Sequence, residues 1–125
     1  MELKSRTIGN ITIIYLRGRL DIFEAESAEA SMSECVEKNR GNHVVLVLEG
    51  LDYLSSSGLR IFISLKRRLS DSGCELVLCN KSNNAVNIFF KIINIKDMFL
   101  IVESEDEAIK YLAVPGKPVA SRIAS

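Results

Sequence analysis

The stretch VVLVLEGLDYLSSSGLRIF, residues 44–62, leads from a predicted strand through three consecutive serines into a predicted helix. Its opening letters, VVLVLEG, are continuously apolar rather than alternating, which is typical of a central strand that is covered on both faces. Over residues 57–69, apolar side chains recur at helical spacing, at Ile61, Phe62, Leu65 and Leu69. The serine run therefore lies where a buried strand turns into a helix.

Upstream of this stretch, the sequence predicts a hairpin followed by a helix. Residues 10–21 are rich in β-branched side chains and end in the turn signal Gly18, so we expect a strand there, preceded by a short strand near residues 1–7. Asp21 and Glu24 resemble a capping pair at the entrance of the following helix. The apolar stripe of that helix, which closes before Gly41, comprises Ala25, Ala28, Met32, Cys35 and Val36.

Downstream of the serine run, strands and helices continue to alternate. The expected elements are a buried strand over residues 74–80, a helix over 83–93, a short strand over 99–102 and a helix from Ser104 to about Leu112. Ser104 and Glu107 form a capping box at the start of the last helix. This order predicts an α/β protein, in which a mixed β-sheet with right-handed crossovers has about four helices packed on it.

One domain accounts for most of the chain. The 125 residues lie within the usual size of a single domain and suffice for a sizeable core. We place this domain over residues 1–112. Residues 113–125 contain two prolines and a glycine and have no usable periodicity, so we expect them to form a flexible C-terminal tail.

Charge and hydropathy narrow the possible partners. The chain has 16 basic and 16 acidic residues, so its zero net charge does not draw the whole molecule to nucleic acid or an anionic membrane. The basic residues 66–68 lie in the last turn of a predicted helix, where they complement the helix dipole. No secretory signal opens the chain, and no apolar run approaches the roughly 18 residues of a membrane span. We expect a cytoplasmic protein without a nucleic-acid or membrane partner.

The three cysteines do not predict a metal or disulfide site. Cys35, Cys74 and Cys79 are odd in number and lie in apolar segments, which is typical of small buried hydrophobic residues. Cys74 and Cys79 flank a predicted strand and would lie about 16 Å apart, too far to share one zinc ion. We therefore expect no metal and no cofactor.

The serine run is not expected to be catalytic. A serine nucleophile needs a base, and the single histidine, His43, enters the central strand at the end opposite to Ser55, Ser56 and Ser57, at least about 16 Å away. No G-x-S-x-G motif occurs, and Gly58 stands alone rather than in a phosphate-binding loop. We expect no catalytic residue and no enzymatic activity.

Two other roles fit the serine run. One serine can cap the helix, which stabilises a helix by ~1 kcal/mol. Three serines followed by Gly58 indicate a small, polar turn, as a contact surface requires, and glycine would let a partner's backbone come close. A phosphate at a helix N-terminus faces unpaired amides, so its negative charge would leave the fold intact while disrupting an acidic or apolar partner.

Two motifs together give the chain a family resemblance. LRGRLDIFEA, residues 16–25, followed by LDYLSSSGLRIF, residues 51–62, resembles the STAS domain of bacterial anti-sigma factor antagonists, over nearly all of residues 1–112. The resemblance implies a protein that binds an anti-sigma factor or related serine kinase and so releases a sigma factor or other regulator. It also implies that the kinase inactivates the protein by serine phosphorylation and that a phosphatase of the PP2C type reverses this.

The resemblance also implies particular site residues. Family members are phosphorylated in a D-S-S-G stretch, which makes Ser56 the acceptor here, with Ser55 and Ser57 as alternatives because Ser55 stands where the family commonly has aspartate. The implied partner-binding residues are Asp21, Ser55, Ser56, Ser57, Gly58 and Leu59. Asp21 can serve both as a helix cap and in the partner surface. The alternative function is a scaffold or assembly domain of the same fold that works without phosphorylation.

Overall fold

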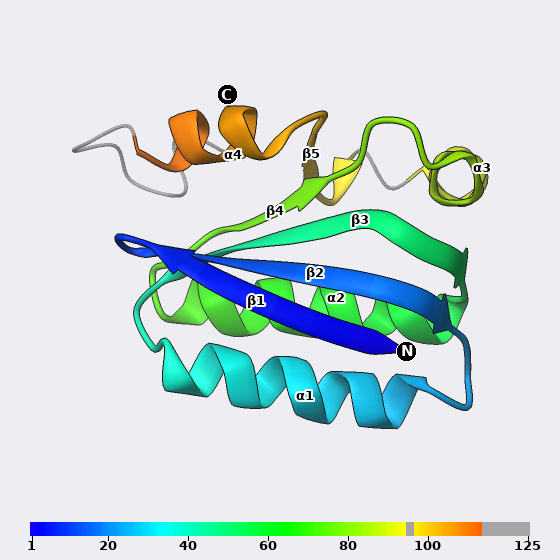
Figure 1. Ribbon diagram of the computed structural model, residues 1–125, viewed down its shortest axis with the longest axis horizontal. Coiled ribbons are helices and arrows are strands. Elements are labelled where there is room, and N and C mark those ends of the chain that lie inside the picture. Colours follow the sequence, from blue (N-terminus) through cyan, green and yellow to red (C-terminus); the bar gives the residue numbers. More distant parts are fainter. Residues whose placement is uncertain (95–96, 114–125) are drawn as a thin grey trace.

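The computed structural model describes residues 1–94 and 97–113, and these form one sheet with helices on both faces (Figure 1). The strands are β1 (Glu2–Ile8), β2 (Ile11–Leu20), β3 (His43–Leu54), β4 (Leu76–Cys79) and β5 (Leu100–Val102). They follow one another across the sheet in chain order, with β1 antiparallel to β2 and all other neighbours parallel. The predicted mixed sheet is confirmed.

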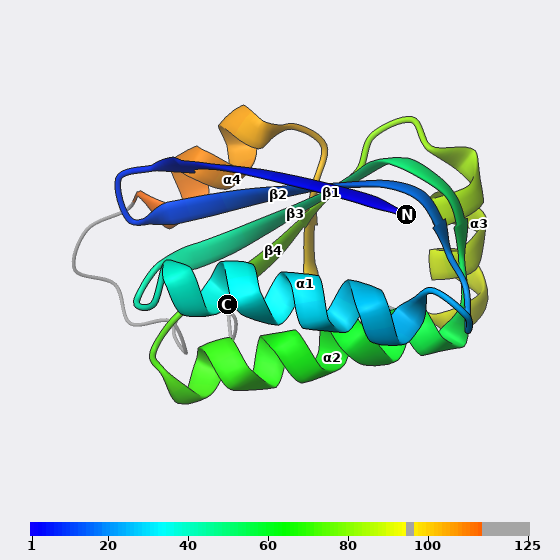
Figure 2. The same cartoon turned by 60° about the horizontal axis from the view of Figure 1, so that its bottom comes forward.

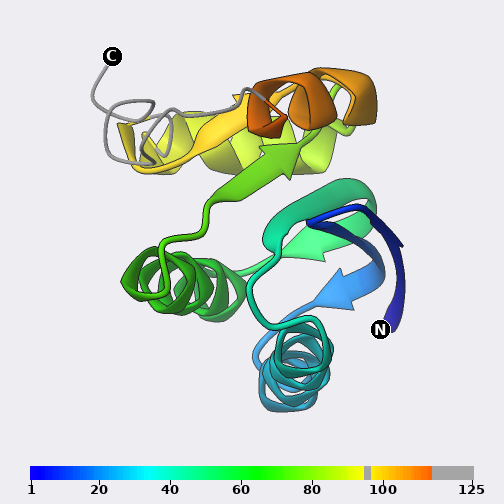
Figure 3. The ribbon, with the colours of Figure 1, turned by 90° about the vertical axis from the view of Figure 1, so that its left-hand side faces the viewer.

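Helices follow the four parallel strands. They are α1 (Ala25–Lys38), α2 (Ser56–Asp71), α3 (Asn84–Ile93) and α4 (Glu105–Leu112). Figures 2 and 3 show α1 and α2 side by side on one face of the sheet, and Figure 3 shows α4 on the other. The predicted α/β class and the four helices are therefore confirmed. The C-terminal tail that we predict over residues 113–125 lies outside the described residues, except for Ala113.

Hydrophobic cores lie on both faces of the sheet, and the continuous apolar run of β3 contributes side chains to each of them. Val44, Leu46 and Leu48 of β3 face α1 and α2, whereas Val45 and Val47 face α4. Because successive side chains of a strand point to opposite faces, a strand covered on both sides needs apolar residues at every position. The first core is the larger of the two, and Val86 and Phe90 of α3 extend it.

Gly18 differs from its prediction as a strand end. It lies inside β2 at a positive φ of 107°, and the pairing of β2 with β3 shifts register on either side of it. Such irregularities suit glycine because it adopts positive φ without steric cost. Both strands continue past the shift, so that Leu20 pairs with Leu54. The segment LDYL therefore forms the last part of β3.

Burial of the cysteines agrees with their interpretation as small hydrophobic residues. Cys35, Cys74 and Cys79 are all buried and carry free thiols. Burial raises the pKa of the Cys79 thiol to about 11, with a smaller contribution from nearby carboxylates. Such a thiol is protonated at neutral pH and is a poor nucleophile or metal ligand.

No helix within residues 1–94 and 97–113 is long and apolar enough to cross a membrane.

Candidate functional site

The parallel strands end at one edge of the sheet, and the turns there carry the predicted site. β2 runs into the turn at Asp21, and β3 runs into Ser55–Ser57, which we call the serine turn. Leu20 and Leu54, the last residues of these neighbouring strands, are paired. Asp21 and the serine turn are thus brought together, as expected where helices begin at the carboxyl ends of parallel strands.

Ser55 is the helix cap. Its backbone is extended, and its Oγ accepts a hydrogen bond from the Gly58 amide at 3.2 Å. The same hydroxyl donates to the carbonyl oxygen of Leu20 at 2.9 Å, and the Ser55 amide donates to that carbonyl at 3.0 Å. The hydroxyl is therefore used both as donor and as acceptor, and it joins the end of β2 to the start of α2.

Ser56 has a different environment from its neighbour. It is the first residue of α2 and is exposed, whereas Ser57 is half-buried. Neither hydroxyl forms a hydrogen bond with another of the described residues. The first turn of α2 contains no acidic residue. Ser56 thus presents its hydroxyl to solvent beside the unpaired amides and the positive end of the helix dipole.

Gly58 and Leu59 face the interior, which corrects the expectation that the glycine admits a partner's backbone. Both residues are buried. A Cβ added to Gly58 would lie 2.8 Å from carbon atoms of Leu20 and of Leu54. The glycine is required because the first turn of α2 packs tightly on the ends of β2 and β3. Gly58 and Leu59 therefore pack the start of α2 against the sheet, and they contribute little exposed surface to the site.

Asp21 holds the turn before α1. Its Oδ1 accepts hydrogen bonds from the amides of Phe23 and Glu24, each at 3.0 Å, and its Oδ2 lies 3.7 Å from Nε of Arg19. The predicted capping pair is half correct. Asp21 caps the turn, but the Glu24 carboxylate does not reach back to it and instead lies 3.7 Å from the amino group of Met1.

Ile22 and Phe23 are surface residues that the sequence reasoning missed. Their exposed fractions are 68% and 90%, which is unusual for large apolar side chains. They follow Asp21 directly and therefore lie at the same edge of the sheet as the serine turn. The sequence did contain a signal for them. Ile22 and Phe23 are large and apolar, yet they belong neither to the strand pattern of β2 nor to the apolar stripe of α1.

A second set of polar contacts fixes the loop between β4 and α3. The Glu49 carboxylate accepts hydrogen bonds from the amides of Lys81 and Ser82 and from the Ser82 hydroxyl. Burial acts to raise the pKa of Glu49, but these hydrogen bonds outweigh it and lower the pKa. Nδ2 of Asn83 donates to the carbonyl oxygens of Leu48 and Leu51. These hydrogen bonds fasten the loop to β3.

His43 lies far from the serine turn, as predicted. It begins β3, whereas the serine turn follows the last residue of that strand. Nδ1 of His43 accepts a hydrogen bond at 3.0 Å from the amide of Glu75, which stands before β4. The histidine thus belongs to the opposite edge of the sheet and forms no relay with Ser55, Ser56 or Ser57 in this chain.

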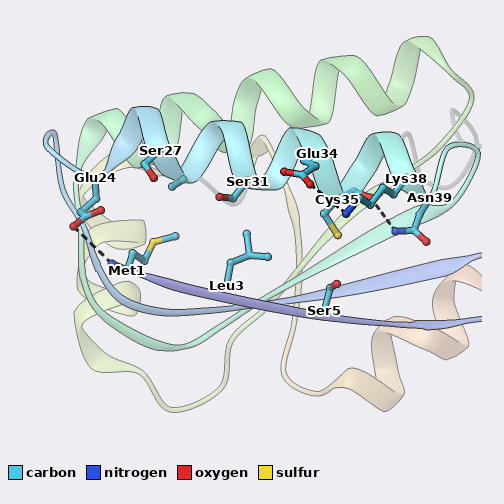
Figure 4. Close-up of a pocket in the computed structure, with 11 residues that line it drawn as sticks. Met1, Leu3, Ser5, Glu24, Ser27, Ser31, Glu34, Cys35, Lys38 and Asn39 are labelled. Atoms are coloured by element: carbon cyan, nitrogen blue, oxygen red, sulfur yellow. Dashed lines mark hydrogen bonds and ion pairs between the residues drawn. The ribbon is translucent and has the colours of Figure 1, made fainter.

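A groove between β1 and α1 lies away from the predicted site residues. It has a volume of about 370 Å³, and Figure 4 shows Leu3 and Ser5 of β1 facing Ser27 and Ser31 of α1 across it. None of the site residues inferred from the sequence lines this groove. The serine turn instead has the exposed Ser56 close to the exposed apolar side chains of Ile22 and Phe23, which suits contact with a macromolecule better than enclosure of a small ligand.

Comparison with known proteins gives the chain its family. A family model described as the STAS domain matches residues 2–108. BtrV of Bordetella bronchiseptica, whose name describes an anti-sigma factor antagonist, is 32% identical over 108 residues, which cover 86% of this chain and 91% of BtrV.

Solved structures show the same fold. A Thermotoga maritima protein described as an anti-sigma factor antagonist has a TM-score of 0.79 at 18% identity, with 88% of this chain and 93% of that one covered. The Bacillus protein SpoIIAA in its phosphorylated form has a TM-score of 0.64 at 21% identity, with 87% and 97% covered. Because the family model spans most of the chain and BtrV is 32% identical over nearly the same length, the chain belongs to the STAS domain family.

Proposed function

We propose that this protein is an anti-sigma factor antagonist that is switched off by phosphorylation of Ser56. In the unphosphorylated form it binds an anti-sigma factor that is also a serine kinase, and this binding releases a sigma factor or other regulator. The observation that carries the proposal is the difference between two adjacent serines. The Ser55 hydroxyl is engaged as donor and acceptor, whereas Ser56 is exposed at the first position of α2.

The physical chemistry of a helix N-terminus supports a switch without unfolding. A phosphate on Ser56 would face the unpaired amides of the first turn, where negative charge is favourable. No acidic residue of that turn would repel it. The relative SpoIIAA has been solved in unphosphorylated and in phosphorylated form, and this chain matches the two about equally, with TM-scores of 0.65 and 0.64. That pair supports a fold that persists through the modification.

The contact surface that we propose consists of Asp21, Ile22, Phe23, Ser56 and Ser57. Asp21 shapes the turn that presents Phe23, and Ser55 shapes the turn that presents Ser56. A partner that covers the apolar pair Ile22 and Phe23 would also remove Ser56 from water. A phosphate adds about 1.5 to 2 negative charges, which are costly to bury against an apolar or acidic partner. Phosphorylation would therefore release the partner, and a phosphatase of the PP2C type would restore binding.

Kinase-dependent phosphate uptake tests this function. The full chain and its Ser55→Ala, Ser56→Ala and Ser57→Ala variants are incubated with ATP and the switch kinases of the source organism, and the intact masses are measured. We expect one phosphate on the unaltered chain and on Ser57→Ala, and none on Ser56→Ala. Ser55→Ala should still be labelled, although loss of the cap costs it ~1 kcal/mol of stability.

Two outcomes would contradict the proposal. Full labelling of Ser56→Ala would move the acceptor to another residue. If no kinase labels the unaltered chain, while the chain still binds its partner, the protein works as a phosphorylation-independent scaffold. Circular dichroism of each variant serves as the control that an unlabelled chain is still folded.

A further inference from the structure

Arg60 lies one helical turn after the proposed phosphorylation site. Ser56 and Arg60 are four residues apart in α2, and both are exposed. Side chains at positions i and i+4 of a helix lie on the same face. Long side chains on a helix lean toward its N-terminus, so that each covers the turn before its own Cα. An Arg60 side chain in this preferred orientation would bring its guanidinium to the turn that contains Ser56.

Among the described residues, Arg60 shares its lack of an ion pair with Arg17 and Arg67, and of these three it is the residue one helical turn after Ser56. Arg6 pairs with Glu105, and Arg40 and Arg68 both pair with Glu37. Within residues 1–94 and 97–113, Arg60 takes part in no ion pair. Acidic residues occupy the first turn of α1 and of α4, but the first turn of α2 has none. This helix start therefore combines the Arg60 charge and the positive end of the helix dipole with a first turn that contains no acidic residue.

We propose that Arg60 is the intramolecular partner of the phosphate on Ser56. The inference rests on the proposed function, because it concerns the phosphorylated state of that site. A guanidinium binds two oxygens of a phosphate through a pair of parallel N–H donors, which makes it a stronger partner than a neutral donor. Arg60 thus stabilises the phosphorylated form, because it gains an ion pair with the phosphate when Ser56 is phosphorylated.

The test compares thermal midpoints of the full chain with and without phosphoserine at position 56. Phosphoserine is inserted during translation, so the measurement does not depend on a kinase. We expect the phosphate to raise the Tm of the unaltered chain by about 2–5 °C. In Arg60→Gln the increase should fall by at least about half, because the phosphate keeps only the helix dipole and amides. In 1 M NaCl the two chains should show similar shifts, since the Debye length is then about 3 Å.

The matched control is Arg67→Gln. Arg67 is exposed on the same helix but lies eleven residues from Ser56, so its removal should leave the phosphate-dependent shift unchanged. An equal Tm shift in Arg60→Gln and in the unaltered chain would overturn the role of Arg60. Absence of kinase labelling would instead overturn the proposed function, and the two failures are therefore distinguishable.

Discussion

Ser55 and Ser56 carry the same hydroxyl group one residue apart, and the backbone gives them opposite environments. The extended conformation of Ser55 turns its Oγ back onto the Gly58 amide, while Ser56 already belongs to the helix and faces solvent. Gly58 completes the arrangement from the inside, since only a residue without a side chain fits against Leu20 and Leu54. Within four small residues, Ser55 thus caps the helix, Ser56 is exposed to solvent, and Gly58 allows close packing.

Substitution of Gly58 tests the packing role. Gly58→Ala should lower the free energy of unfolding by about 1–3 kcal/mol, because the new methyl group overpacks the contact with Leu20 and Leu54. This 1–3 kcal/mol is the expected net loss, after the smaller gain, below about 1 kcal/mol, that alanine brings over glycine in the first turn of a helix. Urea unfolding measures the change, and Ser64→Ala at an exposed position of α2 is the control. A Gly58→Ala chain as stable as the parent would show that the position is not tightly packed.

At the scale of elements, a polar cluster connects the first strands to the last helix. Arg6 of β1 donates to the Tyr15 hydroxyl of β2 at 2.8 Å and to Glu105 of α4 at 2.9 Å, and the Tyr15 hydroxyl donates to Glu105 at 2.5 Å. The hydrogen bond from Tyr15, together with the one from Arg6, lowers the pKa of Glu105 although partial burial opposes this. The cluster holds α4 against the edge of the sheet that β1 and β2 form.

This cluster predicts a component of acid sensitivity. Because the pKa of Glu105 is lower in the folded chain than in the unfolded chain, its stabilising contribution is complete above the unfolded value of about 4.3 and is lost as the pH falls through the folded pKa. Urea midpoints measured from pH 7 to pH 3 should therefore fall less steeply for Glu105→Gln than for the parent. Glu29→Gln, at an exposed position of α1, provides the comparison. Equal slopes for all three chains would exclude a contribution from Glu105.

At the scale of the whole molecule, the fold followed from periodicity, whereas several residue roles did not. The continuous apolar run of β3 and the helical stripes of α1 and α2 have clear periods, so the order of elements and the two-sided sheet were predictable. The role of Gly58 depends on which side of α2 docks on β2 and β3, which no local pattern records. Glu24 was misassigned because its partner, the amino group of Met1, is distant in sequence.

The exposed apolar pair also belongs to this scale, because only the assembled edge places it beside the serine turn. Phe23 is 90% exposed, so Phe23→Ser should change the free energy of unfolding by less than about 0.5 kcal/mol. If Phe23 lies in the contact surface, the affinity for the anti-sigma factor should fall by roughly tenfold or more. Titration calorimetry measures this, with Ile88→Ser on α3 as a control for general loss of surface hydrophobicity. Equal affinities of the parent and Phe23→Ser would remove Phe23 from the contact surface.

The hydrogen bonds from Ser55 to the Leu20 carbonyl also determine at what stage of folding the serine turn takes its final shape. The two residues are 35 positions apart, and the contact requires β2 to be aligned with β3, which follows it in the sequence only after the whole of α1. Contacts of this separation form late, because the intervening chain must first be ordered. A chain still leaving the ribosome carries the letters SSSG but not the shaped turn. An enzyme that recognises the turn by its shape would therefore act on finished molecules and pass over nascent or misfolded ones.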